Sequence, residues 1–393
     1  CPLIMRINDL AKEHATELDA LIDGAMMLDS QNYGLNCENE INAVFYYPIS
    51  IGNPFQSLYY SKFMENGIVP IGTNNLNNVA SIRWPGKKSL HLHWLGNIIG
   101  DTENKTVANQ RIDDFLLQID VMKSNGFKII WTVHNILPHD AILQDCQIRL
   151  RVELVKRCDI IHTMCDDTTE LSEAFFTIPE NKIVNIPHPT YENFYPNQYS
   201  ELESRFQLGI NNDEFVFLFF GSIQAYKGLH DLVRAFKEID SKTEMKLKLI
   251  IAGKVYNQSN FKTIKNEIDA SENILLMQNR IANEDVQHYF KAANVCVCPY
   301  RITLNSGVAH LSHTFGTPVI GPNVGGFKEL LSNGGGLTFS QLDFEDLVSA
   351  MYQSLSIDFE KEREKIMKIN SKYNPSEISS KFARIVSGVD SDE

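Results

Sequence analysis

The chain has 393 residues, of which 43% are hydrophobic, and it carries a formal net charge of −13. This length suits two globular domains of roughly 150 to 200 residues each. The negative charge and the lack of a sustained basic stripe argue against nucleic acid as a general partner.

Residues 1–40 are expected to form a helical extension ahead of the first domain. Apolar residues recur at helical spacing between Ile7 and Asp29. The segment lacks the charged start and apolar core of a secretory leader, and no stretch of the chain reaches the roughly 18 to 20 apolar residues of a spanning helix. Because the chain begins with Cys1 rather than Met, we expect a processed form or a module of a larger polypeptide.

An N-terminal α/β domain is predicted over residues 41–195. Its strands are near-continuously apolar, which is typical of a parallel sheet covered on both faces. The predicted strands are 43–48, 90–94, 128–134, 160–163 and 183–186, and the clearest helices are 56–66 and 112–125. Gly67 and Gly126 follow these helices as stop signals.

A segment rich in proline and asparagine, 187–197, is interpreted as a hinge, and a second α/β domain is predicted over residues 196–373. Its expected strands are 215–220, 247–252, 274–277, 295–299 and 318–320, with helices at 229–239, 261–270, 283–293 and 307–315. Residues 374–393 are expected to hold a last helix that crosses back to the first domain. Two doubly wound domains facing each other predict a ligand cleft at the carboxyl ends of their strands.

The turn after strand 215–220 is the most specific local feature. The strand breaks at Gly221, a short loop carries Lys227 and Gly228, and a periodic helix follows. Backbone N–H groups, a helix N-terminus and an ammonium group converge there, as in sites for phosphate or diphosphate. The loop matches neither Gly-x-x-x-x-Gly-Lys-Ser/Thr nor Gly-x-Gly-x-x-Gly, which disfavours a P-loop ATPase and NAD chemistry. An ordinary strand–helix junction is the alternative interpretation of this segment alone.

The seven cysteines are sparse, and no Cys-x-x-Cys pair occurs. Reduced thiols in a cytoplasmic protein explain this usage better than a disulfide framework or a zinc site. No helix carries histidines at ligand spacing either, so no metal ligands are predicted. Peripheral contact with the inner face of a membrane stays an open alternative.

Short motifs follow one another in a fixed order along both domains. The second domain has Gly221 with Lys227-Gly228, then Ala252-Gly253, Pro299-Tyr300, Ser306-Gly307, Gly316-Thr317-Pro318-Val319 and Gly325-Gly326-Phe327-Lys328-Glu329; the first has Asn53-Pro54-Phe55, Thr132-Val133-His134-Asn135 and Asn185-Ile186-Pro187-His188-Pro189. This ordered set resembles GT-B glycosyltransferases, in particular the family 4 enzymes that build surface polysaccharides. The resemblance starts at about Ala43 and implies an α/β fold of two Rossmann-like domains.

The resemblance implies a glycosyltransferase that moves a sugar from a nucleotide-diphosphate donor to a glycan or lipid-linked acceptor, in capsule, O-antigen or exopolysaccharide synthesis. Such an enzyme must stabilise the charge that grows on the departing diphosphate. Lys227 is the expected catalytic cation and His134 the residue that assists at the anomeric carbon, without a metal or other cofactor. The expected donor-binding residues are Gly221, Ser222, Gln224, Lys227, Ser306, Gly307, Val308, His310 and Glu329, and the expected acceptor-binding residues are Asn53 and His93.

Two departures from the family pattern bear on the mechanism. Family 4 enzymes often carry an arginine in the loop after the strand glycine, where this chain has Ser222 and Gln224. The two glutamates that usually precede the Gly-x-Pro-Val element are replaced by Thr303 and Leu311. Family membership implies retention of the anomeric configuration. A nucleotide-sugar epimerase and a non-catalytic glycan-binding or partner module are the alternatives.

Three of the candidate residues also have a purely structural interpretation. Ser306 fits the N-cap of the following helix, a role that is compatible with presenting N–H groups to a phosphate. His134 fits a hydrogen-bonded histidine at a strand end. His93 shares one face of its strand with His91, where core packing and cleft lining are equally compatible with the pattern.

Overall fold

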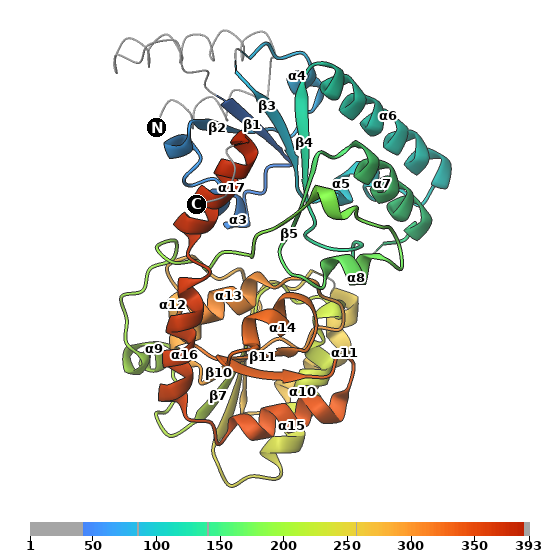
Figure 1. Cartoon of the computed structure of the whole chain (residues 1–393). Coiled ribbons are helices and arrows are strands. Elements are labelled where there is room, and N and C mark those ends of the chain that lie inside the picture. Colours follow the sequence, from blue (N-terminus) through green and yellow to red (C-terminus); the bar gives the residue numbers. More distant parts are fainter. Residues whose placement is uncertain (1–41, 85, 140, 257, 389–393) are drawn as a thin grey trace. The chain divides into compact units, whose positions relative to one another are not determined.

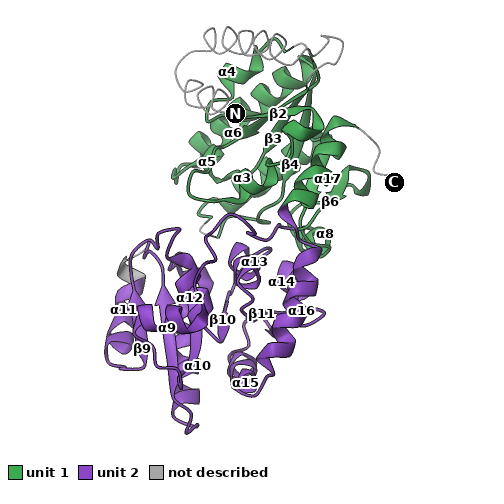
Figure 2. Cartoon of the chain, turned by 90° about the vertical axis from the view of Figure 1, so that its left-hand side faces the viewer, with its two compact units in different colours: residues 1–187, 376–393 green, residues 188–375 purple. Residues whose placement is uncertain are grey.

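The computed structural model describes residues 42–84, 86–139, 141–256 and 258–388, so the expected N-terminal extension lies outside the described residues. The chain divides into two compact units, residues 1–187 with 376–393 and residues 188–375 (Figure 2). The division falls after Pro187, within the segment interpreted as a hinge, rather than after Tyr195. Each unit contains a parallel six-stranded sheet, which confirms the predicted α/β fold class.

The sheet of unit 1 has the order β2-β1-β3-β4-β5-β6, and every neighbouring pair is parallel. Its strands are β1 (Asn42–Tyr47), β2 (Ile68–Gly72), β3 (Lys88–Leu92), β4 (Phe127–Thr132), β5 (Ile160–Thr163) and β6 (Ile183–Asn185). Strand β2 is absent from the sequence prediction because Pro70 interrupts its short apolar run. It lies at the sheet edge, where a strand tolerates proline.

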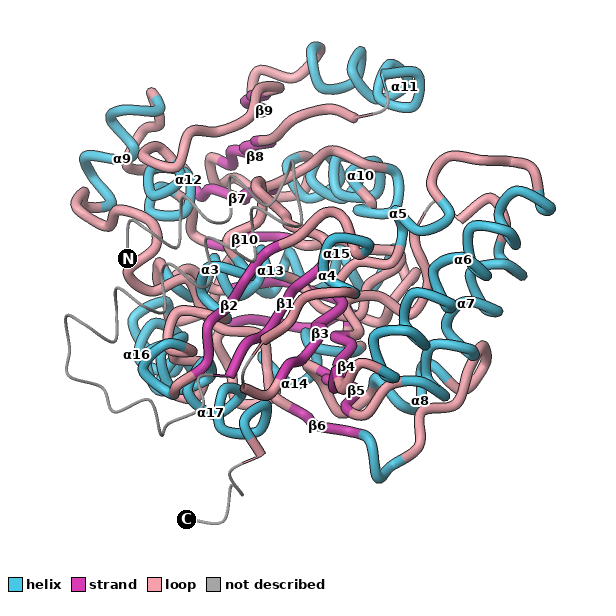
Figure 3. Tube along the Cα trace, turned by 90° about the horizontal axis from the view of Figure 1, so that it is seen from above, coloured by secondary structure: helices cyan, strands magenta, loops and turns pink. Residues whose placement is uncertain are grey.

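Helices cover both faces of this sheet, with α6 and α7 on one face and α3 and α17 on the other (Figures 1 and 3). The elements are α3 (Phe55–Tyr59), α4 (Asn77–Ala80), α5 (Gly96–Ile99), α6 (Lys105–Ser124), α7 (Gln144–Arg157), α8 (Thr168–Ser172) and α17 (Pro375–Ser387), with 3-10 turns η1 (Met64–Asn66) and η2 (Glu180–Lys182). The helix predicted over 56–66 is therefore divided into α3 and η1. Helix α17 packs on unit 1, where Ser379 Oγ donates to the carbonyl oxygen of Tyr59 at 2.8 Å.

The sheet of unit 2 has the order β12-β11-β10-β7-β8-β9 and is also parallel. Its strands are β7 (Phe215–Phe220), β8 (Leu247–Ala252), β9 (Ile274–Met277), β10 (Val295–Val297), β11 (Val319–Pro322) and β12 (Gly336–Phe339). Strands β7 and β10 lie side by side where the strand order reverses. In sheets of this kind, ligands bind at the carboxyl ends of the strands at that point.

The helices of unit 2 are α9 (Glu201–Leu208), α10 (Leu229–Asp240), α11 (Gln258–Asp269), α12 (Val286–Ala292), α13 (Gly307–Thr314), α14 (Gly325–Leu331), α15 (Phe344–Ser354) and α16 (Phe359–Ser371), with one 3-10 turn, η3 (Ala225–Lys227). Apolar residues of α10, α11 and α15 form one buried cluster with one face of the sheet. On the other face, Phe220 packs on Phe290 of α12. Within the residues that the structure describes, no helix is long and apolar enough to cross a membrane.

Candidate functional site

Gly221 ends strand β7 in the left-handed region, with φ of +104°. Its N–H donates to the carbonyl oxygen of Ala252 at 2.9 Å, so the sheet uses the donor that the sequence assigned to a phosphate. The end of the neighbouring strand β8 also approaches Gly221 closely, because a Cβ atom on Gly253 would lie 1.8 Å from the Gly221 carbonyl oxygen. Gly221 therefore contributes space rather than a hydrogen bond.

Lys227 lies over this space. It belongs to η3, and only 7% of its surface is exposed. A Cβ atom added to Gly221 would lie 3.0 Å from Lys227 Nζ and 3.5 Å from Val308 Cγ2. The structure thus brings together the glycine after β7, the lysine of the following loop and the first turn of α13.

The ammonium group of Lys227 is buried without a compensating carboxylate. Burial lowers its pKa to about 8, an effect that Cys298 and Cys296 partly oppose. Among the described residues, no carboxylate lies within ion-pair distance of Nζ. Lys227 Nζ lies over the ring of Tyr300, whose centroid is 5.3 Å away. A buried cation in this state favours an incoming anion.

Helix α13 starts beside the same space. Ser306 is its N-cap, and Ser306 Oγ accepts a hydrogen bond from the N–H of Ala309 at 3.3 Å. Within the described parts of the chain, the N–H groups of Gly307 and Val308 have no hydrogen-bond acceptor. The cap and the two N–H groups without an acceptor therefore coexist, and together with the helix dipole they make this terminus suited to an anion.

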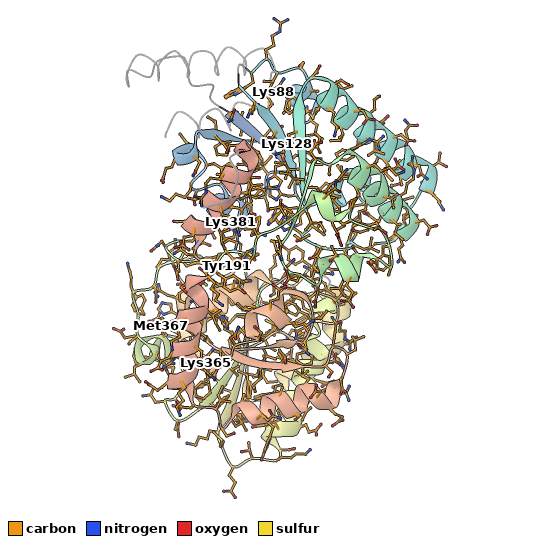
Figure 4. The ribbon with its side chains drawn as sticks, viewed as in Figure 1. Lys88, Lys128, Tyr191, Lys365, Met367 and Lys381 are labelled. Atoms are coloured by element: carbon orange, nitrogen blue, oxygen red, sulfur yellow. The ribbon has the colours of Figure 1, made fainter. Side chains whose placement is uncertain are left out.

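Two tyrosines support this terminus, and the sequence assigned a role to neither. A Cβ atom on Gly307 would lie 2.4 Å from the Tyr191 hydroxyl, so only glycine fits there. Tyr191, labelled in Figure 4, is held by a hydrogen bond from its N–H to Thr314 Oγ1 of α13 at 2.9 Å. The buried Tyr300 hydroxyl lies beside Ser306 and has no hydrogen-bond partner of normal geometry among the described residues. The only sequence signal for Tyr300 was its place just after a core strand.

Ser222 and Gln224 occupy the loop between Gly221 and Lys227, and Gln224 Nε2 donates to Ser222 Oγ at 2.9 Å. Gln224 also lines a hollow of about 280 Å³ together with Arg301. The Arg301 guanidinium is paired with Asp231 at 2.8 and 2.9 Å. Arg301 therefore does not replace the arginine that this loop lacks.

His310 and Glu329 were also predicted to bind the donor. The His310 ring is buried and stacks on His188 with centroids 4.8 Å apart. Burial holds the pKa of His310 well below its usual range. Glu329 is half-buried on α14, a helix that begins with a hydrogen bond from Gly326 N to the Leu304 carbonyl oxygen at 2.8 Å. Donor binding by His310 and Glu329 stays a prediction.

In unit 1, His134 follows strand β4 and is partly exposed. Its ring stacks on Trp94, with centroids 4.2 Å apart, and meets the edge of Phe55 at 4.9 Å. Asn53 Oδ1 accepts a hydrogen bond from Phe55 N at 3.0 Å and so fixes the start of α3. The residue predicted to bind an acceptor thus also positions an aromatic neighbour of His134.

His93 lies behind His134 rather than at the surface. Only 1% of it is exposed, and its ring nitrogens contact Tyr60 and His134 at 2.7 and 3.0 Å. Of the two interpretations of the histidine pair on β3, the structure supports core packing, since His91 is fully buried as well. With no exposed ring nitrogen, His93 has no atom to offer an acceptor in this structure.

Comparisons with known proteins agree with this architecture. Residues 200–373 match the family model described as glycosyl transferases group 1. A D-inositol 3-phosphate glycosyltransferase of Corynebacterium aurimucosum is 27% identical over 214 residues, which cover 52% of this chain and 51% of that protein. An uncharacterized glycosyltransferase of Methanocaldococcus jannaschii is 24% identical over 183 residues, 45% of each chain. The matches therefore span about half the length of these curated relatives.

Solved structures resemble the chain over most of its length. HepE of Anabaena, in complex with UDP and glucose, has a TM-score of 0.65 at 13% identity and covers 88% of this chain and 100% of its own. Sucrose-phosphate synthase from Thermosynechococcus elongatus has a TM-score of 0.63 at 16% identity, over 88% and 98% of the two chains. WaaG, a glycosyltransferase involved in lipopolysaccharide biosynthesis, has a TM-score of 0.61 at 13% identity, over 88% and 100%.

The two parallel sheets and these similarities define a protein of the GT-B glycosyltransferase fold, as the sequence predicted. The match to the glycosyl transferases group 1 model, residues 200–373, lies within unit 2.

Proposed function

We propose that the chain transfers a sugar from a nucleoside-diphosphate donor to a glycan or lipid-linked acceptor. The observation that carries this proposal is the buried Lys227 ammonium, which has no carboxylate partner among the described residues and lies beside Gly221 and the start of α13. A diphosphate supplies the missing negative charge. Because more charge develops on it as the anomeric bond breaks, Lys227 stabilises the transition state more than the bound donor.

The other roles follow from the donors that the structure leaves available. The N–H groups of Gly307 and Val308, capped by Ser306, bind the diphosphate oxygens, and the Tyr300 hydroxyl adds a further donor. His134 contacts a sugar hydroxyl. Lysine and helix N–H groups together supply the positive charge, so we propose that turnover needs no divalent metal and persists in EDTA.

The finer assignments rest on the relatives. HepE is described in complex with UDP and with UDP-glucose, which supports UDP-sugars as the first donors to test. WaaG is described as a glycosyltransferase involved in lipopolysaccharide biosynthesis, which supports surface polysaccharide synthesis as the proposed role. Retention of the anomeric configuration is proposed only from the resemblance of the sequence to family 4 enzymes. The cysteines among the described residues are free and buried, which supports a cytoplasmic location. We also propose peripheral contact with the inner membrane face.

Nucleotide binding tests the role proposed for the buried Lys227 ammonium. We expect UDP or another nucleoside diphosphate to raise the melting temperature of the full chain, because ligand binding stabilises the folded state by mass action. Lys227→Ala removes a charged hydrogen bond of about 1.5 to 3 kcal/mol, so the dissociation constant rises by about 10- to 150-fold. Lys242→Ala, which removes an exposed lysine paired with Glu238, is the matched control and leaves binding unchanged. Equal affinity in Lys227→Ala and wild type contradicts the site.

Product analysis then tests the reaction. Incubation with a panel of nucleotide sugars and acceptor glycans releases free nucleoside diphosphate and a glycosylated product if transfer occurs, and NMR of that product gives its anomeric configuration. A free epimerised nucleotide sugar identifies an epimerase instead. Binding without any turnover identifies a non-catalytic module.

A further inference from the structure

The space over Gly221 in unit 2 brings a buried lysine amine next to a helix start. A Cβ atom on Gly221 would lie 3.0 Å from Lys227 Nζ and 3.5 Å from Val308 Cγ2, so both side chains line the same space. Lys227 is 7% exposed, and no carboxylate among the described residues acts on its ammonium group. The N–H groups of Gly307 and Val308 have no acceptor among these residues either. An anion that binds at the start of α13 therefore meets Nζ.

Burial changes the chemistry of this amine as well as its charge. It lowers the pKa of Lys227 to about 8, although Cys298 and Cys296 act in the opposite direction. At about pH 7.5, roughly one Lys227 amine in four is then neutral, against about one in a thousand at the ordinary lysine pKa of about 10.4. The other titratable group that faces Nζ is Tyr300, and residues 307–309 of α13 carry none. A neutral lysine amine in a dehydrated pocket is a nucleophile.

An acyl phosphate matches both the helix start and the amine. Its phosphate group suits the N–H groups and the dipole of α13. Its acyl carbon is joined to the phosphate through a single oxygen atom, so it lies beside the bound phosphate, on the side of Nζ. The amine nitrogen forms a bond to that carbon, and the bond from the carbon to the phosphate oxygen breaks. Phosphate leaves with the electron pair, stabilised by the same N–H groups, and water takes the proton that the amine loses.

We propose that Lys227 is a modification site, at which small acyl phosphates bind through their phosphate at the start of α13 and transfer their acyl group to Nζ. The product is an amide without positive charge, and it fills the space over Gly221. Acylation of Lys227 therefore removes the cation that attracts an anion to this site. That this loss stops sugar transfer rests on the proposed function, whereas the modification itself does not.

Two other lysines separate the effect of burial from that of the helix start. Burial also lowers the pKa of Lys128 in β4 and of Lys291 in α12. Lys128, labelled in Figure 4, lies near the amino end of its strand. Lys291 lies in the last turn of its helix, where unpaired carbonyl oxygens rather than N–H groups are found. These two lysines therefore share the lowered pKa with Lys227 but lack a terminus that attracts phosphate.

Site-resolved mass spectrometry of the full chain tests the proposal. The protein is incubated at about pH 7.5 with isotope-labelled acetyl phosphate, and the acetylation of each lysine is followed with time. We expect Lys227 to react at least about tenfold faster than Lys128 and Lys291. Lys242, an exposed lysine whose pKa is raised by its hydrogen bond to Glu238, should react more slowly still. Equal rates at Lys227 and Lys291 overturn the proposal.

A change of reagent tests whether the phosphate group directs the reaction. The neutral ester p-nitrophenyl acetate carries the same acyl group but gains nothing from the start of α13. With this ester, the rate advantage of Lys227 over Lys291 should fall several-fold. An excess of inorganic pyrophosphate should slow the reaction of acetyl phosphate with Lys227 and leave that with Lys291 unchanged. The same advantage with both reagents, or no effect of pyrophosphate on Lys227, contradicts the proposal.

The consequence for binding is measured with UDP. Lys227→Gln resembles the acetylated side chain, so we expect this variant and the acetylated wild type to lose about 10- to 150-fold in UDP affinity by titration calorimetry. Acetylated Lys227→Arg, which has no nucleophile at this position, should keep the affinity of the untreated variant. If wild type does not bind UDP, the proposed function fails, and the acetylation rates still decide this proposal. UDP binding without selective acetylation of Lys227 overturns the proposal and leaves the donor site standing.

Discussion

Lys227 Nζ lies over the face of the Tyr300 ring, 5.3 Å from its centroid. The aromatic face attracts the ammonium group, and a contact of this type is worth about 0.5 to 2 kcal/mol. It offsets part of the cost of burying a lysine, since Lys227 is only 7% exposed. The ring thus holds a cation in place before an anion arrives.

Replacing the Tyr300 ring separates this contact from the hydroxyl. In Tyr300→Leu we expect nucleoside diphosphate affinity to fall by about 2- to 30-fold, because the ammonium loses its aromatic contact of about 0.5 to 2 kcal/mol. Tyr300→Phe keeps the ring, and any loss of affinity that it shows measures the hydroxyl alone. Titration calorimetry with UDP checks both. Equal binding by wild type and Tyr300→Leu excludes a role for the ring.

The pH dependence of binding follows from the Lys227 pKa of about 8. A diphosphate binds the protonated form, so affinity is constant below pH 8 and falls as the pH rises through that value. Calorimetry between about pH 6.5 and pH 9.5 measures this, and Lys227→Arg, whose guanidinium stays charged, should remove the dependence. A flat wild-type profile contradicts the assignment of Lys227.

The same pKa makes a prediction for the free protein. Lys227 titrates near pH 8 when folded and near 10.5 when unfolded, so between these values the unfolded chain binds more protons. Its contribution to stability therefore increases with pH across this window and is least favourable below pH 8. Urea unfolding of wild type and Lys227→Met at pH 7.5 and pH 10 measures this contribution. The free energy of unfolding of the variant should exceed that of wild type by less at pH 10 than at pH 7.5.

The sequence predicted the fold better than it predicted the details of the site. The run Phe215 to Phe220 coincides with β7 because continuous burial on both faces demands an unbroken apolar strand. Strand β12 was absent from the prediction because it is short, half-exposed and starts at the glycine cluster. There, Gly336 approaches the Val319 carbonyl so closely that a Cβ atom would lie 1.8 Å away.

Residues at strand ends were predictable, but their partners were not. His134 was identified from its place at the end of a strand, yet its neighbours Phe55, His93 and Trp94 come from other parts of unit 1. Such pairings are set by tertiary packing, and no local pattern encodes them. The burial of His93 is one consequence. Another is that the Gly221 N–H belongs to the sheet, because the register of β7 against β8 extends one residue beyond the strand.

Gly221→Ala tests whether the space after β7 matters for the anion site. The new methyl group would lie 3.0 Å from Lys227 Nζ, at a residue with φ of +104°. We expect weaker nucleotide binding together with a loss of about 1 to 2 kcal/mol in stability from the left-handed backbone. Gly209→Ala is the matched control, since φ is +67° there and nothing lies within 4 Å of the new methyl group. It should lose stability without losing UDP affinity.

Substitution at the N-cap of α13 can separate the structural role of the Ser306 hydroxyl from a role in nucleotide binding. Ser306→Ala removes the bond from Ala309 N and should cost about 1 kcal/mol of stability, like other N-cap losses. Ser200→Ala removes the corresponding cap of α9, where Ser200 Oγ accepts from Glu203 N at 3.3 Å, and gives the stability effect alone. If the terminus of α13 binds a diphosphate, only Ser306→Ala weakens UDP binding as well, because a frayed first turn no longer aims the Gly307 and Val308 N–H groups at one point. If Ser306→Ala and Ser200→Ala lose equal stability and both keep the wild-type affinity for UDP, Ser306 acts only as an N-cap.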